Sequence, residues 1–220
     1  MKLGVLFSGG KDSVHSAWLM KKGSHELSCL ISIFSKNQDS YMFHTPAIEL
    51  TKKQAELMKI PLLIQETEGE KEIELNDLER VLNRAKEDFQ IEGIVSGAIE
   101  SNYQKERIEK ICKKLNLKCF SPLWKKNQIE ILENLIQEKF RIVISAVAGY
   151  PLDKSWIGRE IDNKFIEEMK LLREKYNLNP SGEGGEFESL VLDCPLFSEK
   201  LDVKIIEIIG EKNSWRGIFN

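Results

Sequence analysis

A polar segment near the start of the chain, SGGKDS, combines residue types that bind phosphate groups. The apolar run before it, residues 5–7, is typical of a buried parallel strand, and a helical pattern follows. Adjacent glycines permit a tight turn, and the N–H groups of that turn and of the next helix form a positive concavity suited to phosphate. A lysine adds a full charge, and two serines add hydroxyl donors. We therefore predict that the phosphates of ATP bind at Ser8, Gly9, Gly10, Lys11, Asp12 and Ser13.

The segment is not a Walker A loop, which reads G-x-x-x-x-G-K-[ST]. Gly10 stands where the lysine of that loop belongs, and Asp12 follows Lys11. A carboxylate inside a phosphate-binding loop suits a site that holds Mg2+ on phosphate, so Asp12 is the predicted metal ligand. Lys11 and Asp12 are also predicted to be catalytic. The alternative is a glycine turn that only caps a helix. SGGKDS after an N-terminal strand resembles the pyrophosphate loop of the N-type ATP pyrophosphatases, which include GMP synthetase, NAD synthetase, asparagine synthetase and tRNA thiolation enzymes.

A second candidate segment, GAIESNYQKER at residues 97–107, spans an expected strand end and helix start. Glu100, Tyr103, Gln104 and Arg107 follow helical spacing, so they project from one face toward the strand end. A cationic side chain there is able to meet ATP or the departing pyrophosphate. We expect further ATP contacts from Gly97, Tyr103, Gln104 and Arg107. Ser101 or Asn102 has the simpler alternative of a helix N-cap.

Three carboxylates, Glu183, Glu186 and Glu188, lie within six residues and are separated by glycines. Glycines cost conformational entropy and like charges repel, so a purely structural role does not readily explain this arrangement. The functional interpretation is that a tightly turned backbone makes these carboxylates converge on a cation, a metal or an amine. The alternative is a solvated acidic turn.

Two loops carry further candidates for substrate binding. The loop at residues 149–159 is rich in charged and aromatic residues, and its Trp156 either contacts a ligand or clamps the loop itself. The loop at residues 39–46 contains His44, for which a surface or packing role is the alternative to chemistry.

Short apolar runs alternate with amphipathic segments along the chain, which implies a parallel sheet with right-handed crossovers. The predicted fold class is therefore α/β, a doubly wound, Rossmann-like sheet of the adenine nucleotide alpha hydrolase type. The candidate segments fall at the carboxyl ends of its strands, where ligands gather. After Pro122 the pattern changes, so we expect an ATP-binding domain over 1–121 and a smaller C-terminal α/β domain, which binds substrate and closes over the ATP, over 122–220. The expected strands cover 27–34, 62–64, 94–99, 118–120 and 142–147, and the expected helices 46–58, 72–89, 103–115, 129–138 and 163–176.

The composition is that of an ordinary soluble globular protein, with 41% hydrophobic and 30% charged residues. The formal net charge of −3 argues against a broad nucleic-acid surface. No secretory or membrane-length apolar run occurs, so we expect a cytoplasmic protein without membrane contact. The four cysteines form no C-x-x-C pair, and reduced core or surface residues are the simplest interpretation.

Taken together, SGGKDS, DSYMFHTP, GAIESNYQKERIE, SPLW, GYPLDKSWIGR and GEGGEFES closely resemble the diphthine–ammonia ligases along essentially the whole chain. One departure is Ser189, where the members of that family often carry threonine, and the hydroxyl is kept. The resemblance implies ATP-dependent amidation of diphthine, a modified histidine of translation elongation factor 2. Its products are diphthamide, AMP and pyrophosphate, formed through an acyl-adenylate. No cysteine lies in a nucleophile elbow, so free ammonium is the expected nitrogen source.

Diphthine carries a quaternary trimethylammonium group, which charge and aromatic faces recognise. The resemblance therefore assigns catalysis to Glu183 and Glu186 beside the loop residues, and substrate binding to His44, Trp156, Glu186 and Glu188. Two alternatives stay open: another adenylating ligase or tRNA-modifying enzyme of the same superfamily, and a non-enzymatic sensor of adenine nucleotides. The oligomeric state is also open, with a homodimer among the options.

Overall fold

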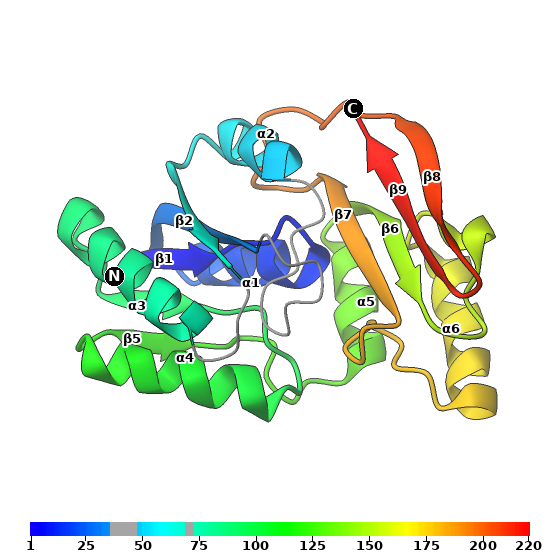
Figure 1. Cartoon of the computed structure of the whole chain (residues 1–220), viewed down its shortest axis with the longest axis horizontal. Coiled ribbons are helices and arrows are strands. Elements are labelled where there is room, and N and C mark those ends of the chain that lie inside the picture. The colour runs from blue at the N-terminus through cyan, green and yellow to red at the C-terminus, as the bar shows by residue number, and fades with distance from the viewer. Residues whose placement is uncertain (36–47, 69–72) are drawn as a thin grey trace. The chain divides into compact units, whose positions relative to one another are not determined.

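The computed structural model describes residues 1–35, 48–68 and 73–220 (Figure 1). The chain forms two compact units, Met1–Trp124 and Lys125–Asn220. The loop at residues 39–46, with its candidate His44, lies outside the described residues. Among the described residues, none of the helices combines the length and the apolar character that a membrane span needs.

The first unit contains a parallel five-stranded sheet in the order β3-β2-β1-β4-β5. The chain moves outward from β1 to β3, returns to β4 on the other side of β1 and ends at β5, so the strand order reverses between β1 and β4. This is the doubly wound fold that the alternating pattern predicts, and the reversal point is where such sheets bind ligands. The elements are β1 (Lys2–Leu6), α1 (Lys11–Lys22), β2 (Glu26–Ser35), α2 (Ile48–Met58), β3 (Leu62–Thr67), α3 (Ile73–Phe89), β4 (Gly93–Val95), α4 (Asn102–Lys114) and β5 (Lys118–Phe120).

The helices α3 and α4 cover one face of this sheet and share an apolar cluster with it (Figure 1). Leu78 and Leu82 lie one turn apart on α3 and are fully buried, and Ile108 and Ile111 on α4 join the same cluster. The strands contribute residues of alternate positions, such as Ile31 and Ile33 of β2, because side chains of a strand alternate between the two faces.

One predicted strand is wrong in its extent. The apolar run at 94–99 predicts a strand, but β4 ends at Val95. Beyond it, Ser96 N–H still donates to the Phe120 carbonyl at 2.8 Å, and Ala98 N–H turns to the Ser96 hydroxyl at 3.2 Å. Ala98 and Ile99 are buried in this turn instead of in the sheet, so burial alone produced the strand-like pattern.

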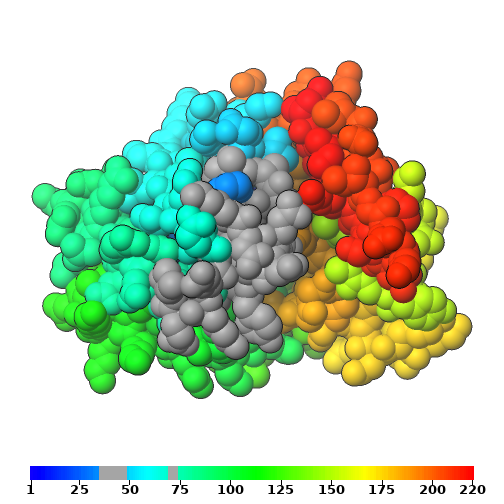
Figure 2. Space-filling model, in the orientation of Figure 1, coloured from blue at the N-terminus to red at the C-terminus, as the bar shows by residue number. Residues whose placement is uncertain are grey.

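The second unit is built on a four-stranded antiparallel sheet in the order β7-β6-β9-β8, with α5 and α6 packed against each other. The carboxyl end of β6 and the start of β7 lie side by side at the same end of the sheet, because these strands are antiparallel neighbours. Figure 2 shows the hairpin of β8 and β9 at the surface of this unit, and Ile206 is 61% exposed on it. The elements are α5 (Gln128–Gln137), β6 (Arg141–Ala148), the short 3-10 helix η1 (Lys154–Trp156), α6 (Asn163–Tyr176), β7 (Phe187–Asp193), β8 (Ile205–Glu211) and β9 (Ser214–Phe219).

Candidate functional site

The glycine turn after β1 has a backbone conformation that favours glycine. Gly9 has φ of +77°, and a Cβ atom at this position would overlap the side-chain oxygen of Gln54 in α2. The Gln54 amide nitrogen donates to the Gly9 carbonyl at 3.0 Å, and the buried Ser32 hydroxyl of β2 donates to the Phe7 carbonyl at 2.5 Å. Two neighbouring elements therefore hold the turn. The sequence analysis did not identify Gln54 or Ser32, because nothing in their local pattern marks residues that support a distant loop.

The start of α1 is arranged like an anion site. Gly10 is the N-cap, and no side-chain hydrogen bond from the described residues caps this helix. A helix start of this kind is suited to phosphate oxygens, because its N–H groups point toward the ligand. The Ser13 hydroxyl donates to the Gly10 carbonyl at 3.0 Å and lies 3.2 Å from the Ser8 hydroxyl, and Ser8 N–H donates to Ser13 Oγ at 3.3 Å. The two predicted serines thus brace the turn in this structure.

Lys11 and Asp12 form an ion pair inside the turn. Lys11 Nζ lies 2.8 Å from Asp12 Oδ2, and the two side chains are 4% and 27% exposed. Asp12 Oδ1 is buried and accepts no hydrogen bond from the described residues. A buried carboxylate oxygen without a donor is costly, so this atom is suited to a cation. The described residues contain no cluster of three metal-ligating side chains.

Gly97 lies directly against this turn. A Cβ atom on Gly97 would be 2.9 Å from the Asp12 carbonyl carbon and from the Ser13 nitrogen. The parallel pairing of β1 with β4, which sets Val5 opposite Val95, brings the two strand ends side by side. The structure therefore unites Gly97 with the glycine turn after β1, and the absence of a side chain permits the close approach.

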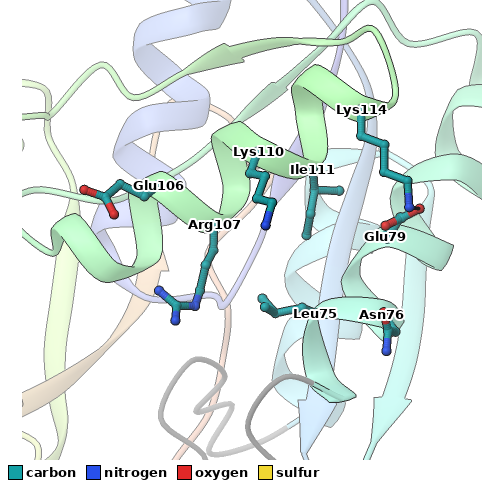
Figure 3. A pocket seen from close by; sticks show the side chains of 8 residues that line it. All are labelled: Leu75, Asn76, Glu79, Glu106, Arg107, Lys110, Ile111 and Lys114. Atoms are coloured by element: carbon teal, nitrogen blue, oxygen red, sulfur yellow. Dashed lines mark ion pairs between the residues drawn. The ribbon is translucent and has the colours of Figure 1, made fainter.

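The other candidates of the second segment lie on α4. Ser101 is the N-cap of α4, and its hydroxyl accepts from Gln104 N–H at 3.3 Å. The simpler alternative, a helix N-cap, therefore holds for Ser101. The Arg107 guanidinium lies 3.4 Å from the centre of the Tyr103 ring. Arg107 also lines a groove of about 650 Å³ between α3 and α4, together with Leu75 and Lys110 (Figure 3). The structure thus brings Tyr103 and Arg107 together, and their contact with ATP stays a prediction.

In the second unit, Glu186 closes the loop that precedes β7. Its Oε1 accepts from Asn179 N–H at 2.9 Å and from the Asn179 side-chain amide at 2.7 Å, and its Oε2 accepts from Gly184 N–H at 2.8 Å. Both carboxylate oxygens are therefore engaged within the loop. Glu183 lies in the same loop and Glu188 lies in β7 opposite Ala146, each partly exposed.

A buried glutamine of α5 anchors the same loop. Gln128 Oε1 accepts from Ser181 N–H at 3.1 Å and from the Ser181 hydroxyl at 2.8 Å, and Gln128 Nε2 lies 3.4 Å from Asn179 Oδ1. Gln128 and Ser181 are 7% and 1% exposed. The chain of contacts from Gln128 through Asn179 to Glu186 gives the acidic segment a defined shape. Sequence reasoning missed Gln128, because a single glutamine at a helix start carries no signal.

Trp156 is buried, at 8% exposure, and its ring already has a cationic partner. The Arg159 guanidinium lies 4.3 Å from the centre of the ring and pairs with Glu168 at 2.5 Å. Trp156 also packs edge-on against Phe165, which in turn packs against Phe187. The burial of Trp156 and its contact with Arg159 favour the alternative interpretation, in which Trp156 clamps its own loop. The aromatic contacts through Phe165 of α6 also link the loop at 149–159 with the acidic segment.

The doubly wound sheet, with an uncapped glycine turn at the end of β1, places the chain among α/β proteins whose fold suits nucleotide binding. Comparison with known proteins is more specific. The family model of the diphthamide synthase N-terminal domain matches residues 1–119, and that of the C-terminal domain matches residues 127–219. The diphthine–ammonia ligases of Bos taurus and Homo sapiens are each 34% identical, over 95% of this chain and 85% of their own. That of Danio rerio is 32% identical, over 95% of this chain and 89% of its own.

A solved structure described as a predicted subunit of tRNA methyltransferase from Methanocaldococcus jannaschii aligns with a TM-score of 0.43 at 18% identity, over 89% of this chain and 98% of that chain. The family models and the relatives cover nearly the whole of this chain. The chain belongs to the diphthine–ammonia ligase family. It is therefore an enzyme, a ligase that forms a C–N bond.

Proposed function

We propose that this enzyme amidates diphthine on translation elongation factor 2 with ammonium, using ATP, and releases AMP and pyrophosphate. The names of its relatives support the substrate. The observation that carries the use of ATP is the glycine turn with Lys11 and Asp12, in which the first turn of α1 lacks a side-chain cap and Asp12 Oδ1 lacks a donor among the described residues. We place the reaction in the cytoplasm, where translation takes place.

The chemistry requires activation, because ammonia does not displace oxygen from a carboxylate at neutral pH. A carboxylate oxygen of diphthine attacks the α-phosphorus of ATP, the bond to the β-phosphate breaks, and pyrophosphate leaves. The nitrogen of ammonia then attacks the acyl carbon, a proton is lost, and AMP departs. Lys11 and the N–H groups at the start of α1 would stabilise the charge that grows on pyrophosphate.

Asp12 would hold Mg2+ through its buried oxygen, and that ion would supply further positive charge beside the phosphates. Ser8 and Ser13 keep the turn in shape, and Gly97 leaves room at the start of α1. We assign Tyr103, Gln104 and Arg107 to further contacts with ATP.

The second unit would supply the diphthine site. A trimethylammonium group has no N–H to donate, so carboxylates recognise it by charge. We assign this role to Glu183 and Glu188, and either of them would steer ammonium or accept its proton. Glu186 would act by shaping the loop, because its oxygens are engaged with Asn179 and Gly184.

The deciding experiment supplies the enzyme with ATP labelled on the γ-phosphate, ammonium, and elongation factor 2 that carries diphthine. We expect the label in pyrophosphate, AMP in equal amount, and a mass change on the elongation factor that matches replacement of a carboxylate oxygen by nitrogen. Elongation factor with unmodified histidine is the matched control and should yield no AMP.

Two outcomes would contradict the proposal. Labelled orthophosphate with ADP would mean that the β–γ bond breaks, which excludes the acyl-adenylate. AMP formation that does not depend on diphthine would assign the chain to another carboxylate substrate.

A further inference from the structure

The carboxyl end of β6 is the point at which two other loops of the second unit meet. Ala148 N–H donates to the Glu186 carbonyl at 2.8 Å, which joins this end to the acidic segment at 183–188. Gly149 N–H donates to the Asn213 carbonyl at 2.8 Å, which joins it to the turn between β8 and β9. Figure 1 shows the end of β6, the start of β7 and this turn at the same end of the sheet. The residues next to Gly149 therefore lie beside the segment to which we assign the recognition of diphthine.

Aromatic side chains reach the surface at this end of the unit. Tyr150 is 68% exposed, and its ring packs edge-on against the ring of Tyr176 at the end of α6, with 5.3 Å between the ring centres. Tyr176 is partly exposed, as is Trp215, which lies in β9 opposite Val147. The contact with Tyr176 restricts the Tyr150 ring, so the ring loses little conformational freedom when a partner covers it.

Two lysines border these rings. Lys175 Nζ lies 5.1 Å from the centre of the Tyr176 ring, and Lys154 Nζ lies 5.5 Å from the centre of the Trp215 ring. Both lysines are exposed, and neither forms an ion pair with the described residues. Their charges are therefore available to the carboxylates of a partner.

This combination of residue types is typical of a surface that binds a protein. Tyrosine and tryptophan are common anchors of protein interfaces, and lysines at the rim select a partner of opposite charge. The substrate of the proposed reaction is a side chain on a protein, so the enzyme must also hold the protein surface around that side chain. We propose that elongation factor 2 docks, through an apolar side chain and carboxylates, on a surface formed by Tyr150, Lys154, Lys175, Tyr176 and Trp215. This inference rests on the proposed function and names the surface through which the partner binds.

Aromatic rings bordered by lysines also occur in proteins that bind single-stranded RNA. The carboxylates nearby favour a protein partner over RNA. Asp153 precedes Lys154, and the acidic segment is hydrogen-bonded to the end of β6. Carboxylates in these positions repel a phosphate backbone, whereas they attract the trimethylammonium group of diphthine.

The test measures equilibrium binding of the full-length enzyme to two forms of elongation factor 2, one with diphthine and one with unmodified histidine. Tyr150→Ser should weaken binding to both forms about tenfold or more, because it removes an anchor for the protein around the diphthine. Tyr150→Phe keeps the ring and should bind like the parent protein. Leu171→Ser is the matched control, since Leu171 is 65% exposed in the same unit and is not part of the proposed surface. Glu183→Gln, in contrast, should weaken binding only to the form that carries diphthine.

Lys175→Glu should also weaken binding to both forms, and the loss should become smaller as the salt concentration rises. Lys200→Glu, at an exposed lysine of the same unit, is the control for this change of charge. In steady-state kinetics, Tyr150→Ser and Lys175→Glu should raise the KM for elongation factor 2 while the kcat and the KM for ATP are kept. A general loss of structure would lower the kcat as well.

The docking surface is overturned if the parent protein binds elongation factor 2 and Tyr150→Ser binds both forms as tightly, or if Leu171→Ser weakens binding as much. A loss confined to the form with diphthine would overturn it too, because Tyr150 would then belong to the diphthine pocket. Binding of a single-stranded RNA oligonucleotide by the parent protein, abolished in Tyr150→Ser, would assign the surface to RNA. A parent protein that neither binds nor amidates elongation factor 2 would instead contradict the proposed function itself.

Discussion

At the scale of single residues, the proposed phosphate-binding turn depends on two kinds of side chain. Asp12 presents a buried oxygen with no donor among the described residues, which is suited to a cation. Gln54 presents an amide that holds the Gly9 carbonyl from another helix. We propose that Asp12 acts on the ligand and that Gln54 acts on the backbone that binds the ligand. Substitution of Asp12 and substitution of Gln54 should therefore affect different kinetic constants.

Asp12→Asn should lower the rate of AMP formation about 100-fold or more, because it removes a few kcal/mol of electrostatic stabilisation from the transition state. The shape of the side chain is kept, so the unfolding temperature should hardly change. Initial rates over a range of Mg2+ concentrations measure the effect. Asp88→Asn, the same change on the exposed part of α3, is the control. A rate near that of the parent protein would remove Asp12 from the active site.

Gln54→Glu should raise the KM for ATP with a smaller effect on kcat, because it replaces the donor to the Gly9 carbonyl by a buried acceptor. The loss of such a buried hydrogen bond costs about 1–3 kcal/mol, which corresponds to roughly a tenfold change or more in affinity. Steady-state kinetics with varied ATP provide the readout. Gln90→Glu, at an exposed position of the same unit, should leave the KM unchanged. If both variants behave alike, Gln54 does not support the turn.

At the scale of elements, the loop before β7 is held in shape by hydrogen bonds within the loop and by hydrogen bonds from α5. Glu186 joins its two ends, and Gln128 fastens its middle to the start of α5. The aromatic contacts from Trp156 through Phe165 to Phe187 extend the same assembly to the loop after β6. The acidic segment is therefore a shaped structure, held by contacts that its own local sequence does not contain.

Glu186→Gln should loosen this loop, since the new amide faces either Gly184 N–H or the donors of Asn179 and cannot accept at both ends. Hydrogen exchange should become faster at residues 179–187, and amidation should slow while ATP affinity is kept. Glu167→Gln, at an exposed site on α6, is the matched control. Unchanged exchange in the loop, together with a lost reaction, would instead place the Glu186 carboxylate in the chemistry.

At the scale of the whole molecule, each unit has its own sheet and its own candidate residues. The first unit carries the glycine turn proposed to bind phosphate, and the second carries the acidic segment. The proposed reaction uses both, with nucleotide binding assigned to the first and the recognition of diphthine to the second. Substitutions in the second unit should therefore impair the recognition of diphthine without changing nucleotide binding.

Glu183→Gln and Glu188→Gln should each lower the rate of amidation up to about fivefold by weakening the attraction for a trimethylammonium cation, because a partly exposed pair of opposite charges contributes about 0.2–1 kcal/mol. Equilibrium binding of ATP should be unchanged in both variants. Glu199→Gln, an exposed carboxylate of the same unit, serves as the control. Parallel losses of ATP binding and of amidation would show that the second unit does not act on diphthine alone.

The sequence by itself determined the doubly wound first unit and the glycine turn after β1, because hydrophobic periodicity, segment length and turn residues are local signals. The same signals misjudged residues 96–99, of which Ala98 and Ile99 are apolar and buried although they lie outside the sheet. Only the tertiary structure revealed that Gln54 supports Gly9 across 45 positions and that Gln128 anchors Ser181 across 53. It also put the Arg159 guanidinium over the Trp156 ring. Such contacts depend on how segments that are distant in the sequence pack together. The local sequence around one residue does not specify which residue packs against it.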